Sequence, residues 1–129
     1  MARPPSAHPT DGELELLQVL WQTGPSGLGP ICTALRQRRP IATTTVATML
    51  KVMLDKNLVR RRRTPQGYLW SAKTTRQNTA TGMVRKLLDL VFDGSAQRLV
   101  AHLLQSDQLS EQERKELRRL IDAELKAGK

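Results

Sequence analysis

The 129-residue sequence has few of the residues that form cross-links, metal sites or reactive centres. Cys32 is its single cysteine, which excludes an internal disulfide and a multi-cysteine metal site. The two histidines, His8 and His102, form no paired metal-binding motif, so we expect no metal. The glycines match no phosphate-binding loop, and no serine has the flanking pattern of a nucleophile elbow. We therefore expect neither a cofactor nor enzymatic activity.

Long apolar runs are also missing. The sequence contains no stretch of about 18 apolar residues, so we expect no membrane insertion. The first five residues, Met1-Ala2-Arg3-Pro4-Pro5, lack the apolar core of a signal peptide. Together with the low cysteine content, these features favour a cytoplasmic protein.

Positive charge is what the sequence has in excess, with a net charge of +9, and it is unevenly placed. Residues 1–80 carry 12 basic and 4 acidic side chains, whereas residues 81–129 carry 9 and 8. Between Arg36 and Arg76, 11 basic residues accompany one acid, Asp55. A concentrated basic field attracts polyanions and favours a nucleic-acid partner. The alternative is a solvated basic face that only keeps the protein soluble.

Three helices are predicted in the first half of the chain. Thr10-Asp11-Gly12-Glu13 fits a capping box, and an apolar stripe that includes Trp21 follows it up to Gly24. A second helix begins between Gly27 and Pro30 and ends before Pro40, with Cys32 on its buried face. A third spans Thr43 to Asn57.

The outer face of the third helix is unusual because it is rich in threonine. It carries Thr43, Thr44, Thr45, Thr48 and Lys51. Threonine is a mediocre helix former, so this cluster needs a reason beyond solubility. Threonine hydroxyls can bond phosphate oxygens and base edges, and their methyl groups can contact thymine. A helix cap followed by merely exposed threonines is the alternative.

A basic β-hairpin is predicted after the third helix. The first strand starts at Leu58-Val59 and continues through Arg60, Arg61, Arg62 and Arg63. Thr64-Pro65-Gln66-Gly67 has the composition of a turn, and Tyr68 and Trp70 share one face of the return strand. Only Asp55 is near enough in sequence to pair with the arginines, so we expect them to face phosphates. Three helices followed by a basic hairpin is the order of a winged helix-turn-helix.

The second half of the chain predicts three short amphipathic helices. Ser110-Glu111-Gln112-Glu113 is a second capping box and opens the last of them. Such short helices cannot bury all their apolar faces against one another, so we expect residues 83–125 to build a twofold homodimer. A monomeric three-helix bundle is the alternative. The residues expected to dimerise are Met83, Leu87, Leu90, Val91, Leu99, Leu103, Leu117, Leu120 and Ile121.

The expected fold is therefore mainly α with a small β-hairpin. We expect a disordered tail over residues 1–8, a winged-helix DNA-binding domain over 9–74 and a helical dimerisation domain over 75–129.

Residues 9–125 resemble the penicillinase repressor family. The segments that carry the resemblance are Thr10 to Trp21, Thr44 to Leu50, Leu54 to Val59, and the hairpin with Tyr68 and Trp70. The resemblance implies a dimeric winged-helix repressor that blocks promoters at a palindromic operator in double-stranded DNA. By position, Thr43, Thr44, Thr45, Thr48 and Lys51 match the family's recognition helix. Arg60 to Arg63 and Gln66 match its wing, which touches the DNA backbone.

Two departures from the family pattern concern its inducing signals. Copper-responsive members carry a C-terminal cysteine cluster, which the ending Leu125 to Lys129 lacks. β-Lactam-responsive members are cut at an Asn-Phe bond in the dimerisation region. The matching segment, Val100 to Leu104, has no such pair, so a membrane sensor protease as partner has no support in the residues.

Two other functions use the same basic surface. An RNA-binding or ribosome-associated protein would stack bases on exposed aromatic residues. Only Trp21, Tyr68, Trp70 and Phe92 are present, and Trp21 lies on an apolar stripe. A winged-helix adaptor that binds acidic proteins is the second alternative, and the run from Arg60 to Arg63 argues against it.

Overall fold

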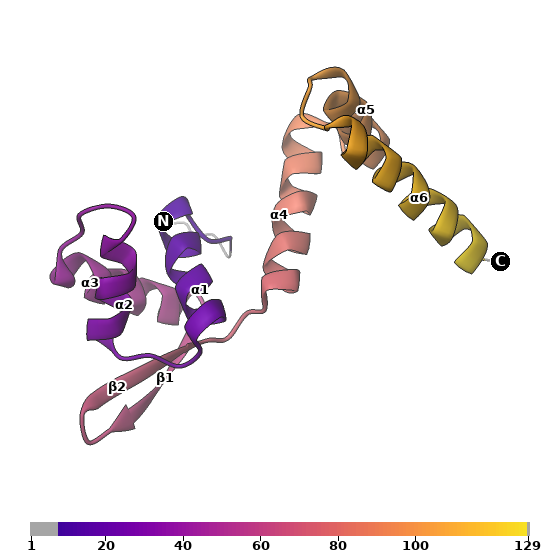
Figure 1. Cartoon of the computed structure of the whole chain (residues 1–129). Helices are drawn as coiled ribbons and strands as arrows, with labels where there is room; N and C mark the ends of the chain where they lie inside the picture. The colour runs from indigo at the N-terminus through magenta and orange to yellow at the C-terminus, as the bar shows by residue number, and fades with distance from the viewer. Residues whose placement is uncertain (1–7, 129) are drawn as a thin grey trace, which may run out of the picture. The chain divides into compact units, whose positions relative to one another are not determined.

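The computed structural model describes residues 8–128, and its helices and strands are shown in Figure 1. The chain divides into two compact units, with the boundary between Met83 and Val84. The tail expected over residues 1–8 lies, apart from His8, outside the described residues. The first unit contains α1 (Asp11–Thr23), α2 (Leu28–Arg36), α3 (Thr43–Asp55), β1 (Val59–Thr64) and β2 (Gly67–Ala72). This order of helices and strands confirms the predicted winged helix-turn-helix.

The ends of the first two helices follow the predicted signals. Thr10 Oγ1 accepts a hydrogen bond from the Glu13 backbone N–H, and the Glu13 carboxylate accepts one from the Thr10 N–H, which confirms the capping box. The helix ends where Gly24 takes a φ of 77°, a conformation that favours glycine. Gly27 caps α2 with its backbone alone.

The third helix is shorter than predicted. It ends at Asp55 rather than Asn57, because Asn57 adopts a left-handed conformation with a φ of 63°. Asparagine tolerates this conformation better than most residues. The resulting turn brings the chain directly into the hairpin.

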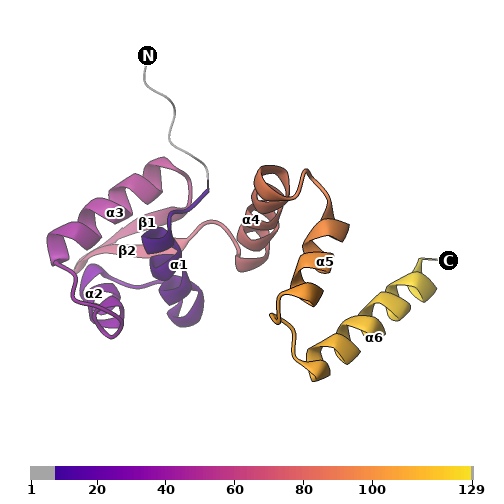
Figure 2. The same cartoon turned by 90° about the horizontal axis from the view of Figure 1, so that it is seen from above.

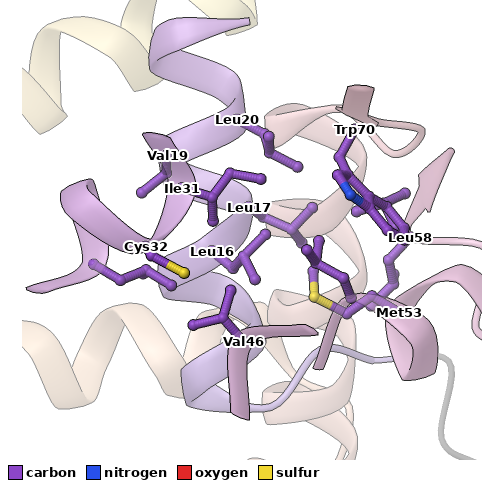
Figure 3. Close-up of a cluster of buried hydrophobic side chains, with 13 residues drawn as sticks. Leu16, Leu17, Val19, Leu20, Ile31, Cys32, Val46, Met53, Leu58 and Trp70 are labelled. Atoms are coloured by element: carbon purple, nitrogen blue, oxygen red, sulfur yellow. The ribbon is translucent and has the colours of Figure 1, made fainter. Parts of the chain in front are cut away.

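The core of the first unit is formed by one apolar stripe from each helix and by the base of the hairpin (Figure 3). Leu16 and Leu17 of α1, Ile31 of α2, and Val46 and Leu50 of α3 are completely buried. Cys32 is buried in the same cluster, as predicted. Such side chains contribute roughly 1.5–3 kcal/mol each on burial, which makes this core the main source of stability.

The hairpin is an antiparallel pair whose base is anchored to the helices. Arg61 lies opposite Trp70, and Arg63 lies opposite Tyr68. Outside the hairpin, the Ser26 and Trp70 backbones exchange two N–H to C=O hydrogen bonds of 2.8 Å. The side chain of Trp70 is only 6% exposed and lies in the core (Figure 3). The segment between α1 and α2 therefore holds the base of the hairpin in place.

Trp21 lies on the predicted apolar stripe of α1 and packs against the core, where it is partly buried. Its indole N–H donates to the Thr74 carbonyl over 3.0 Å. The guanidinium of Arg76 lies 5.0 Å from the centroid of a Trp21 ring. These contacts hold the first turn of α4 (Arg76–Val91) on the first unit. The first unit accordingly extends into α4, as far as Met83.

The second unit contains the rest of α4, together with α5 (Ala96–Gln105) and α6 (Glu111–Ala127) (Figure 2). The predicted capping box at Ser110 and Glu113 is present. Neither α5 nor α6 contains a buried residue. The three helices therefore do not close into a monomeric bundle. Large apolar side chains stay exposed along them, including Leu90 at 72% and Leu125 at 67%.

None of the helices in residues 8–128 is long and apolar enough to cross a membrane.

A buried ion pair that the sequence analysis did not identify joins the start of α1 to the end of α3. Lys56 Nζ lies 2.8 Å from Glu13 Oε1, and the two side chains are only 7% and 6% exposed. The same carboxylate oxygen accepts the Thr10 backbone N–H. The buried Glu13 carboxylate thus both caps α1 and holds the end of α3 beside it.

Replacing Lys56 by Met leaves the Glu13 carboxylate without its cation. Removal of one partner of a buried ion pair is strongly destabilising, so we expect the free energy of unfolding to fall by about 3 kcal/mol. Urea titration followed by tryptophan fluorescence measures this change, because Trp21 and Trp70 both lie in the first unit. Lys86→Met, at an exposed position, is the control. Equal stability of the two variants would contradict the prediction.

Candidate nucleic-acid interface

The outer face of α3 carries the five helix residues that the sequence predicts for DNA contact. Val46, Leu50 and Met53 anchor the helix in the core, so the positions between them face outward. The five predicted residues are all exposed, and they are Thr43, Thr44, Thr45, Thr48 and Lys51.

The threonine hydroxyls on this face are not equivalent. Arg36 Nη2 donates to Thr43 Oγ1 over 2.7 Å, and Thr48 Oγ1 donates to the Thr44 carbonyl over 2.9 Å. The hydroxyls of Thr44 and Thr45 form no hydrogen bond within residues 8–128. No side chain caps the start of α3, at Ala42. The first turn therefore presents both free hydroxyls and free backbone N–H groups, which are donors for phosphate oxygens.

The strand register divides the four wing arginines between two faces of the hairpin. Successive strand residues point to opposite faces, so Arg60 and Arg62 share one face and Arg61 and Arg63 share the other. The guanidinium of Arg61 lies 4.2 Å from the Tyr68 ring centroid and that of Arg63 lies 5.5 Å from it. These cation–π contacts orient two of the four cations and leave their charge in place.

The charge of the wing is not compensated by acidic side chains. In the part of the chain that the structure describes, four ion pairs are present, and none includes Arg60, Arg61, Arg62 or Arg63. Asp55, the one acid near in sequence, is exposed and forms no ion pair there. The hairpin is therefore free to neutralise an external polyanion.

Two hollows on the surface border α3. One lies between α2, α3 and the hairpin, and its lining includes Lys51, Arg61 and Gln66. The other, on the α1 side, is lined by Thr44, Thr45 and Thr48. The first hollow thus brings Lys51 of α3 together with Arg61 and Gln66 of the hairpin, whereas the three threonines line the second hollow.

Arg36 and Arg39 lie beside the threonines of α3, although they were not among the residues predicted for DNA contact. The Arg36 guanidinium donates hydrogen bonds to the Ile41 carbonyl and to Thr43 Oγ1. These bonds position the start of α3. Arg39 lines the hollow on the α1 side and pairs with Glu15 over 3.1 Å. The available signal in the sequence was the cluster of arginines just before the third helix.

The aromatic residues offer little surface for stacking bases. Trp70 is buried, Trp21 and Phe92 are partly buried, and among residues 8–128 only Tyr68 is exposed, at 38%. Its ring already carries the Arg61 guanidinium. The RNA-binding alternative gains no support from this arrangement.

Metal ligands do not gather near this surface. Among the residues that the structure describes, no group of three or more His, Cys, Asp or Glu side chains is close enough to hold a metal ion.

The winged-helix fold and its basic surface are those of a DNA-binding protein, and comparison with known proteins gives its family. A sequence profile of the family described as penicillinase repressor matches residues 9–123. Transcriptional regulator BlaI of Mycobacterium tuberculosis is 33% identical over 121 residues, which cover 91% of this chain and 86% of that protein. The penicillinase repressor of Bacillus licheniformis is 20% identical over 113 residues, 88% of each chain. The chain belongs to the penicillinase repressor family.

One solved structure is similar over part of the chain. It is the solution structure of the monomeric form of Bacillus licheniformis BlaI in complex with the blaP half-operator. The match has 18% identity and a TM-score of 0.49, and it covers 60% of this chain and 93% of that one.

Proposed function

We propose that this repressor acts as a homodimer on a palindromic operator, with α3 in the major groove and the β1–β2 wing on the DNA backbone. The observation that carries this proposal is the hollow that Lys51 of α3 shares with Arg61 and Gln66 of the wing. In addition, α3 exposes free threonine hydroxyls, and within residues 8–128 no acidic side chain pairs with the wing arginines. Occupancy of the operator would exclude other proteins from the promoter.

The two parts of the surface have different tasks in this proposal. Cations that contact phosphates supply affinity without sequence information, whereas side chains that reach base edges discriminate between sequences. We assign the first task to Arg60, Arg61, Arg62, Arg63 and Lys51, with Gln66 at the wing tip. We assign base contacts to Thr44 and Thr45, because their hydroxyls have no partner within the described residues. Thr43 and Thr48 contribute mainly their methyl groups.

Dimerisation is proposed for the second unit because its apolar side chains lack cover. Leu120 and Ile121 lie about half exposed on one stretch of α6, and Leu90 and Val91 are more exposed at the end of α4. A second copy of the same helices would cover these side chains and would place two recognition helices on one operator. Half-sites separated by one helical turn, roughly 10 bp, fit such a dimer.

The remaining parts of the proposal concern partners and location. The similar proteins are named as regulators, and we propose a regulatory role without catalysis. We place the protein in the cytoplasm, where the DNA of bacteria such as Mycobacterium tuberculosis lies. A membrane sensor protease stays an expectation of family membership alone, since Val100 to Leu104 lacks the Asn-Phe pair and lies within α5.

Replacing Arg62 by Ala removes one phosphate contact. We expect weaker binding to operator and scrambled duplexes in nearly equal proportion, and a salt-dependence slope reduced by about 1. Fluorescence anisotropy titrations at several salt concentrations measure both quantities. Arg118→Ala, the same change of charge at an exposed position on α6, is the control. A loss confined to the operator would show that Arg62 reads bases instead.

Replacing Thr45 by Ala should mainly relax base preference, at a cost of about 1–3 kcal/mol on the operator if the side chain makes a good base contact. The ratio of operator affinity to scrambled-duplex affinity measures this. Thr45→Ser keeps the hydroxyl and Thr45→Val keeps the shape, so the pair separates a hydrogen bond from a methyl contact. An unchanged ratio in all three variants would contradict the assigned role.

Replacing Leu120 by Arg places a charge in the proposed dimer interface, where burial without a partner is costly. We expect monomers by multi-angle light scattering, together with an unchanged helical circular dichroism spectrum, because Leu120 is half exposed in the single chain. Gln112→Arg, at an exposed polar position on the same helix, should remain dimeric. A dimeric Leu120→Arg would count against this interface.

A further inference from the structure

The hollow between α2, α3 and the hairpin has features that DNA contact does not explain. Its volume is about 530 Å³, a size suited to a small molecule. Leu28 and Pro30 of α2 line it with accessible apolar groups, and the buried Leu50 and Trp70 lie beneath them. A phosphodiester has no apolar part that could cover such a lining.

The charged groups around this hollow are all cationic. Lys51 and Arg61 line it, and no acidic residue does. The Lys51 ammonium forms no hydrogen bond or ion pair within residues 8–128, and neither does the side-chain amide of Gln66, which lies at the same hollow. Both groups can therefore donate to a bound molecule.

Aromatic rings fix the position of the second cation. The Arg61 guanidinium lies 4.2 Å from the Tyr68 ring centroid and 5.6 Å from that of Trp70. The two rings are 6.0 Å apart and tilted by 59°. A guanidinium that rests on ring faces still offers N–H donors at its edge. The hollow thus combines the Arg61 guanidinium, which the aromatic rings hold in position, with the unpaired Lys51 ammonium and flat apolar surfaces.

We propose that this hollow binds a small organic anion with a flat apolar body, such as an aromatic carboxylate. Its carboxylate would lie between Lys51 and Arg61, and its ring would cover the apolar lining beside Trp70. Organic cations are disfavoured by the two like charges, and inorganic anions leave the apolar lining uncovered.

Such a ligand would act as an inducer. Lys51 and Gln66 belong both to the hollow and to the DNA surface, so the anion and the operator compete for the same groups. This consequence rests on the proposed function, whereas anion binding itself does not.

The test uses the full-length protein and two probes, 1-naphthoate and the uncharged 1-naphthalenemethanol. Titration followed by ¹⁵N–¹H NMR should shift the amide signals of Gly27, Gly29 and Gly67 and the indole signal of Trp70, which line the hollow. The indole signal of Trp21, which does not line it, should stay in place. The alcohol should bind at least about tenfold more weakly, because it lacks the charge.

Two lysine variants locate the charge requirement. Lys51→Met should lower naphthoate affinity about tenfold or more and leave the weak binding of the alcohol, which shows that the hollow is intact. Lys86→Met, at an exposed position on α4, should bind naphthoate like the unaltered protein. Equal affinity of Lys51→Met, equal binding of both probes, or signal shifts outside the hollow would each overturn the proposal.

A final measurement separates this proposal from the proposed function. Naphthoate should release an operator duplex at concentrations that fill the hollow, and the alcohol should not. If the duplex and naphthoate bind together, competition is wrong. If naphthoate fills the hollow but the protein ignores all duplexes, the repressor function fails and the anion site stands.

Discussion

The two backbone hydrogen bonds between Ser26 and Trp70 are the constraint on which the functional surface depends. A two-stranded hairpin is only marginally stable by itself in water. Here its second strand pairs with the segment between α1 and α2, and the Trp70 side chain is buried in the helical core. The wing is thereby held against α2 and α3. The juxtaposition of Lys51 with Arg61 and the hollow between them both follow from this attachment.

Charge is used in two opposite ways in the first unit. Glu13 and Lys56 are buried and paired, so their charges act within the fold and hold the end of α3 beside the start of α1. The wing arginines are exposed and lack acidic partners within the described residues, so their charges act outward. Both partners of a buried ion pair have to be present, because an isolated buried charge is costly. Exposed cations carry no such cost, which allows many of them to gather on one surface.

In the second unit, the helices have apolar faces that the rest of the unit does not cover. Leu88 is buried, whereas Leu90, Val91 and Leu125 are largely exposed. Exposed apolar patches of this kind often mark protein–protein contact sites. The first unit has a core of its own, and in the proposed dimer the second unit would gain one from its partner. The proposal thus divides DNA contact and self-association between the two units.

Local sequence patterns determined the helices, the two capping boxes at Thr10 and Ser110, the burial of Cys32 and the exposure of the threonines on α3, because each depends on neighbours within one or two helical turns. The limits of this reasoning are visible at Asn57, where a left-handed residue ended α3 early. Only the tertiary structure decided that Ser26 pairs with Trp70, that Glu13 meets Lys56 and that Arg36 holds Thr43. It also decided which arginines rest on Tyr68. Periodicity along one element cannot reveal contacts between residues far apart in the chain, because they form only when packing brings separate elements together.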